Sequence, residues 1–167
     1  MHRVHGRAGR EPPRVRAAAG PAAADRQEWD PGWAGTDVAP YLVGQPPQAW
    51  AGLVAAQAEA TAAAWADPRA WEGSTVFGGA EMPAADVGSM MTAEFAVHAW
   101  DVAVGSGQRP PAVPGPLGER VLEGVLAIAP MGREGGWFAP EVPVGTDAPA
   151  FDRALAASGR NPAWTCV

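Results

Sequence analysis

Residues 90–102 read MMTAEFAVHAWDV, a stretch whose apolar residues are typical of a buried helix. Glu94 and His98 stand four residues apart in it. Four residues make about one helical turn, so the two side chains lie on one face, roughly 6 Å apart along the axis. Asp101 comes next along that face. A carboxylate and an imidazole one turn apart have the spacing of metal ligands.

The apolar neighbours of this pair predict that the pair faces the core. Val87, Met90, Met91 and Val102 fall in the stripe that also contains Glu94 and His98. Burial of an ionised carboxylate without compensation costs several kcal/mol, so a buried Glu94 is protonated, paired with a base or bound to a cation. Two interpretations use His98 as well: a metal held by both side chains, or a structural pair in which His98 donates to Glu94. Trp100 points away from this face and is expected in the core.

Working outward from this stretch, helical patterns dominate the chain. Residues 84 to 104 are predicted to form the helix that contains Glu94 and His98, with Gly88 at a close packing contact. A helix begins at Pro46 and Pro47 and continues to Asp67, and residues 74–83 form a short extended segment or irregular hairpin. A long helix over residues 117–129 is interrupted at 130–132, residues 138–144 are extended, and residues 150–158 form a short helix. The fold class is therefore mainly α.

Composition excludes several classes of function. A chain of 167 residues with net charge −6 fits one soluble domain. Its single cysteine, Cys166, rules out an intramolecular disulfide framework, and no apolar run has the length of a membrane span or a signal peptide, so a cytoplasmic protein without membrane partners is expected. The basic residues crowd the start, but this arm lacks interleaved aromatics, so no nucleic-acid partner is expected. The arginines of that arm are Arg3, Arg7, Arg10, Arg14, Arg16 and Arg26.

Residues 93–108, AEFAVHAWDVAVGSGQ, resemble the signature helix of the mycothiol-dependent maleylpyruvate isomerase-like proteins, in the DinB/YfiT-like superfamily of metal-binding four-helix bundles. The tail is also similar to the way in which many members end, in the runs FAPEVPV (138–144), FDRAL (151–155) and GRNPAW (159–164). The resemblance covers roughly residues 45 to 164. It implies an incomplete DinB-like helical bundle over residues 45–167, with a short extended segment and a C-terminal tail. Residues 1–44 are expected to be an Arg-rich, loop-rich segment that either includes the remnant of a bundle helix or is a tail. Because the bundle then lacks one helix, the resemblance implies a start assigned too late or a partner subunit over the gap.

The resemblance further implies a divalent metal, zinc or nickel, held by a glutamate and a histidine of this helix and a histidine of an earlier one. Glu94 and His98 match the first two positions. His5 is carried over as the third ligand, with His2 as the other candidate, although both can equally belong to a tail. Asp101 either orients a ligand or bound water, or caps a neighbouring helix.

The function implied is that of an isomerase or transferase in which the metal activates a low-molecular-weight thiol such as mycothiol. The partners are then this thiol and an electrophilic or carboxylic acid substrate. The alternatives are a metal-binding module without catalysis and a structural helical domain. Because a bundle that lacks a helix exposes an apolar face, a homo-oligomer is also expected.

Overall fold

The structure is a computed structural model that describes residues 39–77 and 79–165. Four α-helices make up most of this part of the chain, so the prediction of a mainly helical protein is confirmed. His2, His5 and Cys166 lie outside the described residues. The elements are η2 (Pro40–Leu42), α2 (Pro47–Trp65), η3 (Pro68–Trp71), β1 (Ser74–Phe77), β2 (Ala80–Pro83), α3 (Ala84–Gly105), α4 (Gly115–Glu134) and α5 (Ala150–Ala157).

Prolines and glycines set the ends of the helices. Pro47 stands in the first turn of α2, and Pro83 precedes α3. After α3 the chain reverses at Gly107, whose φ of 72° favours glycine. The sequence predicts this helix over residues 84–104, and α3 ends one residue later, at Gly105.

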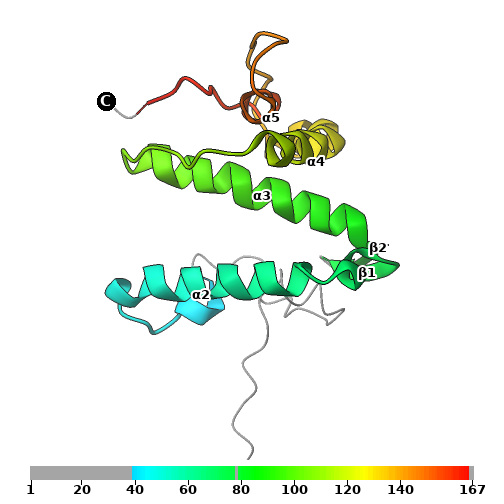
Figure 1. Ribbon diagram of the computed structural model, residues 1–167. Coiled ribbons are helices and arrows are strands. Elements are labelled where there is room, and N and C mark those ends of the chain that lie inside the picture. Colours follow the sequence, from blue (N-terminus) through cyan, green and yellow to red (C-terminus); the bar gives the residue numbers. More distant parts are fainter. Residues whose placement is uncertain (1–38, 78, 166–167) are drawn as a thin grey trace, which may run out of the picture.

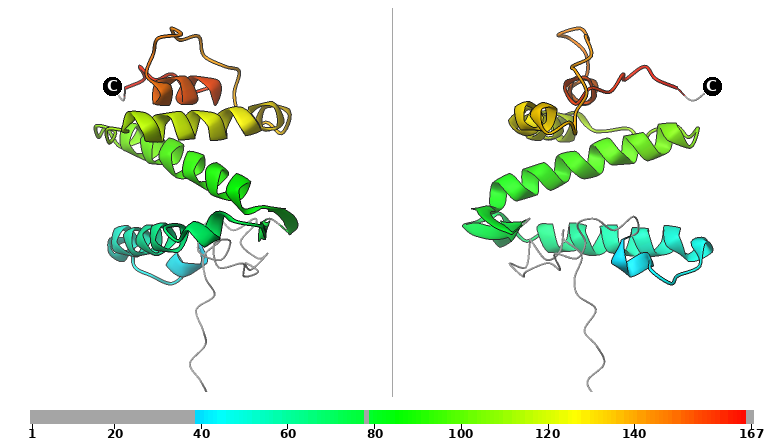
Figure 2. Two further views of the ribbon diagram at one scale, coloured as in Figure 1. Left: turned by 45° about the vertical axis from the view of Figure 1, so that its right-hand side comes forward. Right: turned by 180° about the vertical axis from the view of Figure 1, so that it is seen from behind.

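The four helices lie in the order α2, α3, α4, α5. Figure 1 shows the hairpin joining one end of α2 to α3, with α4 and α5 on the opposite side of α3, and Figure 2 keeps this order from two further directions. α3 packs on α4 and α4 packs on α5, whereas α2 meets α3 mainly through η3 and the hairpin. β1 and β2 pair antiparallel, with Ser74 opposite Pro83, so of the two forms predicted for residues 74–83 the hairpin is the one found.

The hydrophobic core lies between α3, α4 and α5. Glycine allows α4 to approach α3 closely, because a Cβ at Gly124 would stand 2.9 Å from the carbonyl oxygen of Ser89. Arg133 ties the end of α4 to α5 by donating to the Ala157 carbonyl at 3.0 Å. The buried core side chains come from all three helices: Ala93, Val97, Trp100, Val104, Val121, Leu122, Val125, Ala154, Leu155 and Ala157.

α2 contributes little to this core, since Thr61 is its one buried residue. An apolar groove of about 410 Å³ lies between α2 and α3, lined in part by Trp65, Met91 and Phe95. No helix in the described part of the chain is both long and apolar enough to cross a bilayer.

The predicted interruption of the long helix at residues 130–132 is wrong, because α4 continues through Pro130 to Glu134. Proline removes one backbone donor, which leaves the carbonyl of Leu126 without its helical partner. Both Leu126 and Pro130 are exposed, so water can satisfy that carbonyl. The helix therefore tolerates the proline on its outer face.

The segment after α4 follows the prediction more closely. It runs extended past α5, where the Val142 N–H donates to the Ala156 carbonyl at 3.0 Å. α5 ends one residue before the predicted end at Ser158. The start of the segment after α4, at Trp137 and Phe138, lines a pocket together with α4, Glu94 and His98.

Candidate metal centre

Glu94, His98 and Asp101 do not face the core, contrary to the prediction from the apolar stripe. Each follows a buried residue of α3 by one position, so it is rotated by about 100° from the buried face. Their side chains are 37%, 61% and 33% exposed, respectively. The pair therefore lies at the edge of the core. The preceding buried residues are Ala93, Val97 and Trp100.

The sequence predicts the wrong buried face for α3, because this helix carries apolar side chains on every side. Val102, a member of the predicted core stripe, is 69% exposed, and Phe95 is exposed as well. With so many apolar positions, periodicity alone does not select one face. Trp100 is buried, as expected.

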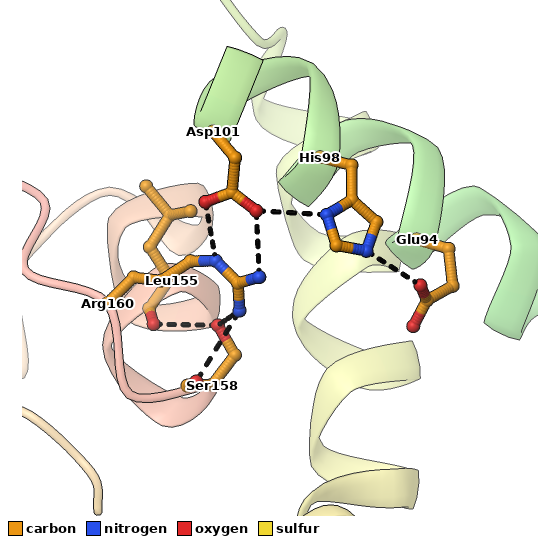
Figure 3. A network of polar contacts seen from close by, with 6 residues as sticks. All are labelled: Glu94, His98, Asp101, Leu155, Ser158 and Arg160. Atoms are coloured by element: carbon orange, nitrogen blue, oxygen red, sulfur yellow. Dashed lines mark hydrogen bonds and ion pairs between the residues drawn. The ribbon is translucent and has the colours of Figure 1, made fainter. Parts of the chain in front are cut away.

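Glu94, His98 and Asp101 form one line of polar contacts along α3 (Figure 3). Nε2 of His98 lies 3.1 Å from Oε2 of Glu94. Nδ1 of the same ring lies 2.9 Å from Oδ2 of Asp101. His98 thus bridges two carboxylates, each through a different ring nitrogen.

A neutral imidazole cannot donate a hydrogen bond in both of these contacts. A neutral ring carries one N–H, whereas an ionised carboxylate only accepts hydrogen bonds. One N–H satisfies either Glu94 or Asp101, and the other contact then brings two acceptors together. A second ring proton or a metal cation removes this conflict.

Asp101 is held from the far side by Arg160, which follows α5. The guanidinium makes a two-pronged contact, with Nε 2.8 Å from Oδ1 and one terminal nitrogen 2.8 Å from Oδ2. The other terminal nitrogen donates to the Ser158 hydroxyl at 3.0 Å (Figure 3). The hydrogen bonds from Arg160 hold the pKa of Asp101 below its ordinary value, against the opposing effect of partial burial, and the contact with His98 lowers it further.

Arg160 belongs to the tail motif GRNPAW, but the sequence did not indicate that it contacts Asp101. The two residues are 59 positions apart, and no helical or strand spacing connects them. Gly159 offers a local signal, because its φ is +84° and a Cβ there would lie 2.7 Å from Ala139. Glycine at this position therefore lets the chain turn so that Arg160 reaches α3.

A pocket of about 370 Å³ opens beside Glu94 and His98. α3 and α4 form its sides, Arg160 lines it as a third polar residue, and Trp137 and Phe138 close it from the loop after α4. A small molecule in this pocket would therefore meet the carboxylate and the imidazole directly.

Glu94 and His98 fit a divalent cation as two of its ligands. Two donors that bind one tetrahedral zinc at about 2.1 Å are about 3.4 Å apart, close to the 3.1 Å that separates Nε2 from Oε2. Within residues 39–77 and 79–165, no group of three or more His, Cys, Asp or Glu residues could hold a metal. The predicted third ligand, His5, and the other candidate, His2, lie outside this part of the chain.

Asp101 contacts His98, which is the arrangement expected of a residue that orients a ligand. In metal sites the second ring nitrogen of a histidine ligand usually donates to a carboxylate or carbonyl, which fixes the tautomer. If Nδ1 donates to Asp101, Nε2 presents its lone pair towards Glu94 and the pocket. Among the described residues, Asp101 contacts His98 and Arg160, which is not the arrangement of a helix cap.

Comparisons with models of protein families, with curated proteins and with solved structures found no match to this chain.

Proposed function

We propose that this protein binds a divalent cation, zinc or nickel, between Glu94 and His98, and that the site uses a low-molecular-weight thiol. The observation that carries the proposal is the position of His98 between two carboxylates, where a neutral ring has no N–H for one of the two contacts. Its two ring nitrogens face two carboxylates, at 3.1 and 2.9 Å. A cation held by Glu94 and His98 would satisfy that second contact and would leave the Nδ1 proton for Asp101.

Each side chain then has a defined task. Glu94 and His98 hold the cation at the edge of the pocket. Asp101 keeps the proton on Nδ1, and Arg160 fixes Asp101 in place with two hydrogen bonds. This chain of contacts sets the orientation of the imidazole without further help from the core.

The thiol assignment rests on the resemblance of residues 93–108 to the maleylpyruvate isomerase-like proteins and on the open pocket. With two or three protein ligands, a divalent cation keeps positions open for a substrate, and it would lower the pKa of a thiol bound there. The pocket beside Glu94 and His98 has room for such a molecule. The reaction class proposed is therefore thiol-dependent isomerisation or transfer on an electrophilic or carboxylic acid substrate, with mycothiol as the candidate thiol.

A structural role is the second candidate, and one observation favours it. A doubly protonated His98 would donate to Asp101 and form an ion pair with Glu94 at the distances found, without any metal. The three residues and Arg160 would then only tie α3 to the chain after α5. A metal-binding module without catalysis lies between these two candidates.

Metal analysis separates the structural role from the other two. The purified full chain should bind about one equivalent of zinc, and Glu94→Ala or His98→Ala should abolish it, because each removes one of the ligands. Glu59→Ala, at an exposed position of α2, is the matched control and should bind as the wild type does. Equal zinc binding by the wild type and both site variants would contradict the proposal. His5→Ala and His2→Ala, measured in the same way, show whether either histidine is the third ligand.

A thiol assay separates the enzyme from the binding module. Zinc-loaded protein should accelerate the isomerisation of maleylpyruvate or the transfer of an electrophile to mycothiol, and the acceleration should depend on both zinc and thiol. If the protein binds zinc but shows no turnover with mycothiol or other cellular thiols, the enzyme is excluded and the metal-binding module without catalysis remains.

A further inference from the structure

The pocket beside Glu94 and His98 is much larger and more apolar than a cation requires. Three polar residues line it, Glu94 and His98 from α3 and Arg160 from the chain after α5. The rest of the lining is apolar and includes Ile128 and Met131 of α4 and two aromatic rings, Trp137 and Phe138. Such a pocket, with a few polar groups beside an apolar wall, is typical of a small-molecule site.

Trp137 is exposed in this wall although it is the largest apolar side chain there. The residue is 68% exposed. Its backbone N–H donates to the Gly132 carbonyl at 2.8 Å, and Gly136 before it has a φ of 72°. A Cβ at Gly135 would stand 3.1 Å from the indole ring, so glycine gives the ring enough space at this position. The turn therefore holds the indole at the pocket and does not bury it in the core.

Phe138 supports this arrangement from beneath. Its ring would lie 3.0 Å from a Cβ at Gly132, so a glycine at this position lets the ring pack closely onto α4. Phe138 is half-buried against the core, whereas Met131 beside it is 53% exposed. An exposed indole and thioether next to a packed phenyl ring offer a flat, polarisable surface to a ligand.

We propose that this wall, Met131, Trp137 and Phe138, binds the aromatic ring of a small arylalkyl ligand. At about 370 Å³ the pocket is near the lower end of the range for ligand sites, which suits one ring with a short arm. The arm directs a donor atom, such as a thiol or hydroxyl, towards Glu94 and His98. The position of that donor atom rests on the proposed metal function, whereas the binding of the ring does not.

The test uses the metal-free full chain and benzyl alcohol, with ethanol as the probe that lacks a ring. Binding is followed by NMR shifts of the protein and fitted to a dissociation constant. Trp137→Ala should weaken benzyl alcohol binding about three- to tenfold, the range expected for one aromatic contact. Trp137→Phe should keep most of the affinity, and ethanol should not bind measurably.

Trp164→Ala is the matched control, because Trp164 is also an exposed tryptophan and lines no part of this pocket. It should leave the affinity unchanged. Absence of benzyl alcohol binding, an equal loss in both alanine variants, or shifts confined to the groove between α2 and α3 would each overturn the proposal. Because no metal is present, these results are independent of zinc binding. Ring binding without zinc binding would contradict the metal function alone.

Discussion

At the scale of single residues, the chemistry of this protein is concentrated around His98. The imidazole lies between two carboxylates of its own helix, and one of them, Asp101, is also bound by Arg160. Asp101 therefore favours a proton on Nδ1 of His98, because an ionised carboxylate only accepts hydrogen bonds. Its effect on a metal would be indirect, through the tautomer and orientation of His98.

Asp101→Asn should lower zinc affinity about 10- to 100-fold, the loss usual for a carboxylate that orients a histidine ligand. The amide has the same shape but provides a weaker acceptor for Nδ1–H. Competition titration with a zinc chelator measures the change. Asp86→Asn, in the exposed first turn of α3, is the control. Unchanged affinity in Asp101→Asn would mean that Asp101 does not orient a metal ligand.

Gly88 is a second residue with a specific task. A Cβ at Gly88 would stand 2.5 Å from the Trp71 ring and 2.8 Å from the Trp65 ring, which pack edge to face. Gly88→Ala should therefore destabilise the protein by about 1–3 kcal/mol, the usual cost of overpacking, although alanine favours the helix by about 1 kcal/mol. Urea unfolding measures the difference.

Gly52→Ala is the matched control, because nothing lies within 4 Å of a Cβ built at Gly52 in α2. It should stabilise the protein by up to about 1 kcal/mol through helix propensity. A stabilising Gly88→Ala would show that the two indoles move aside easily and that the close contact is not a constraint.

At the scale of elements, the Asp101–Arg160 contact joins α3 to the chain after α5. The pKa of Asp101 lies below its ordinary value, which means that the ionised carboxylate stabilises the folded protein. This contribution is complete above the pKa of Asp101 in the unfolded chain, about 4, and is lost as the pH falls through the lower folded value.

Asp101→Asn should consequently lose less unfolding free energy than the wild type as the pH falls below about 4. The measurement compares urea midpoints of the wild type and the variant at pH 7 and pH 3. The wild type should lose more stability between these values than the variant does. Equal losses would show that the ion pair with Arg160 contributes nothing measurable to folding.

The elements themselves could largely be predicted from the sequence, because their signals are local. Pro47 and Pro83 mark where α2 and α3 begin, and the Glu94–His98 spacing brings these two side chains together. Three features could not be predicted. Whether α4 continues through Pro130 depends on how exposed this turn of the helix is. The buried face of α3 depends on which helices pack on it, and Arg160 meets Asp101 only through the tertiary fold.

At the scale of the whole molecule, residues 39–77 and 79–165 leave an open groove on the side of α3 that faces α2. The groove there is lined by apolar side chains, and Trp50, Val54 and Phe95 are exposed on α2 and α3. Exposed apolar surface of this kind favours association between copies. The homo-oligomer therefore stays a prediction, and its expected interface is the groove between α2 and α3.

The protein should self-associate in a concentration-dependent way, and Phe95→Glu should reduce the association by placing a charge in the groove. Size-exclusion chromatography with light scattering measures the mass. Val144→Glu, exposed outside this groove, is the control. A wild type that stays monomeric over a hundredfold range of concentration would contradict the prediction.

The most direct test of the metal assignment is the position of the ion itself. Crystals of the zinc-loaded protein, measured at the zinc absorption edge, should give one anomalous peak about 2.0–2.2 Å from both Nε2 of His98 and Oε2 of Glu94. An empty map at these two atoms, with zinc bound elsewhere or not at all, would contradict the account and leave His98 as a proton-bridged structural residue.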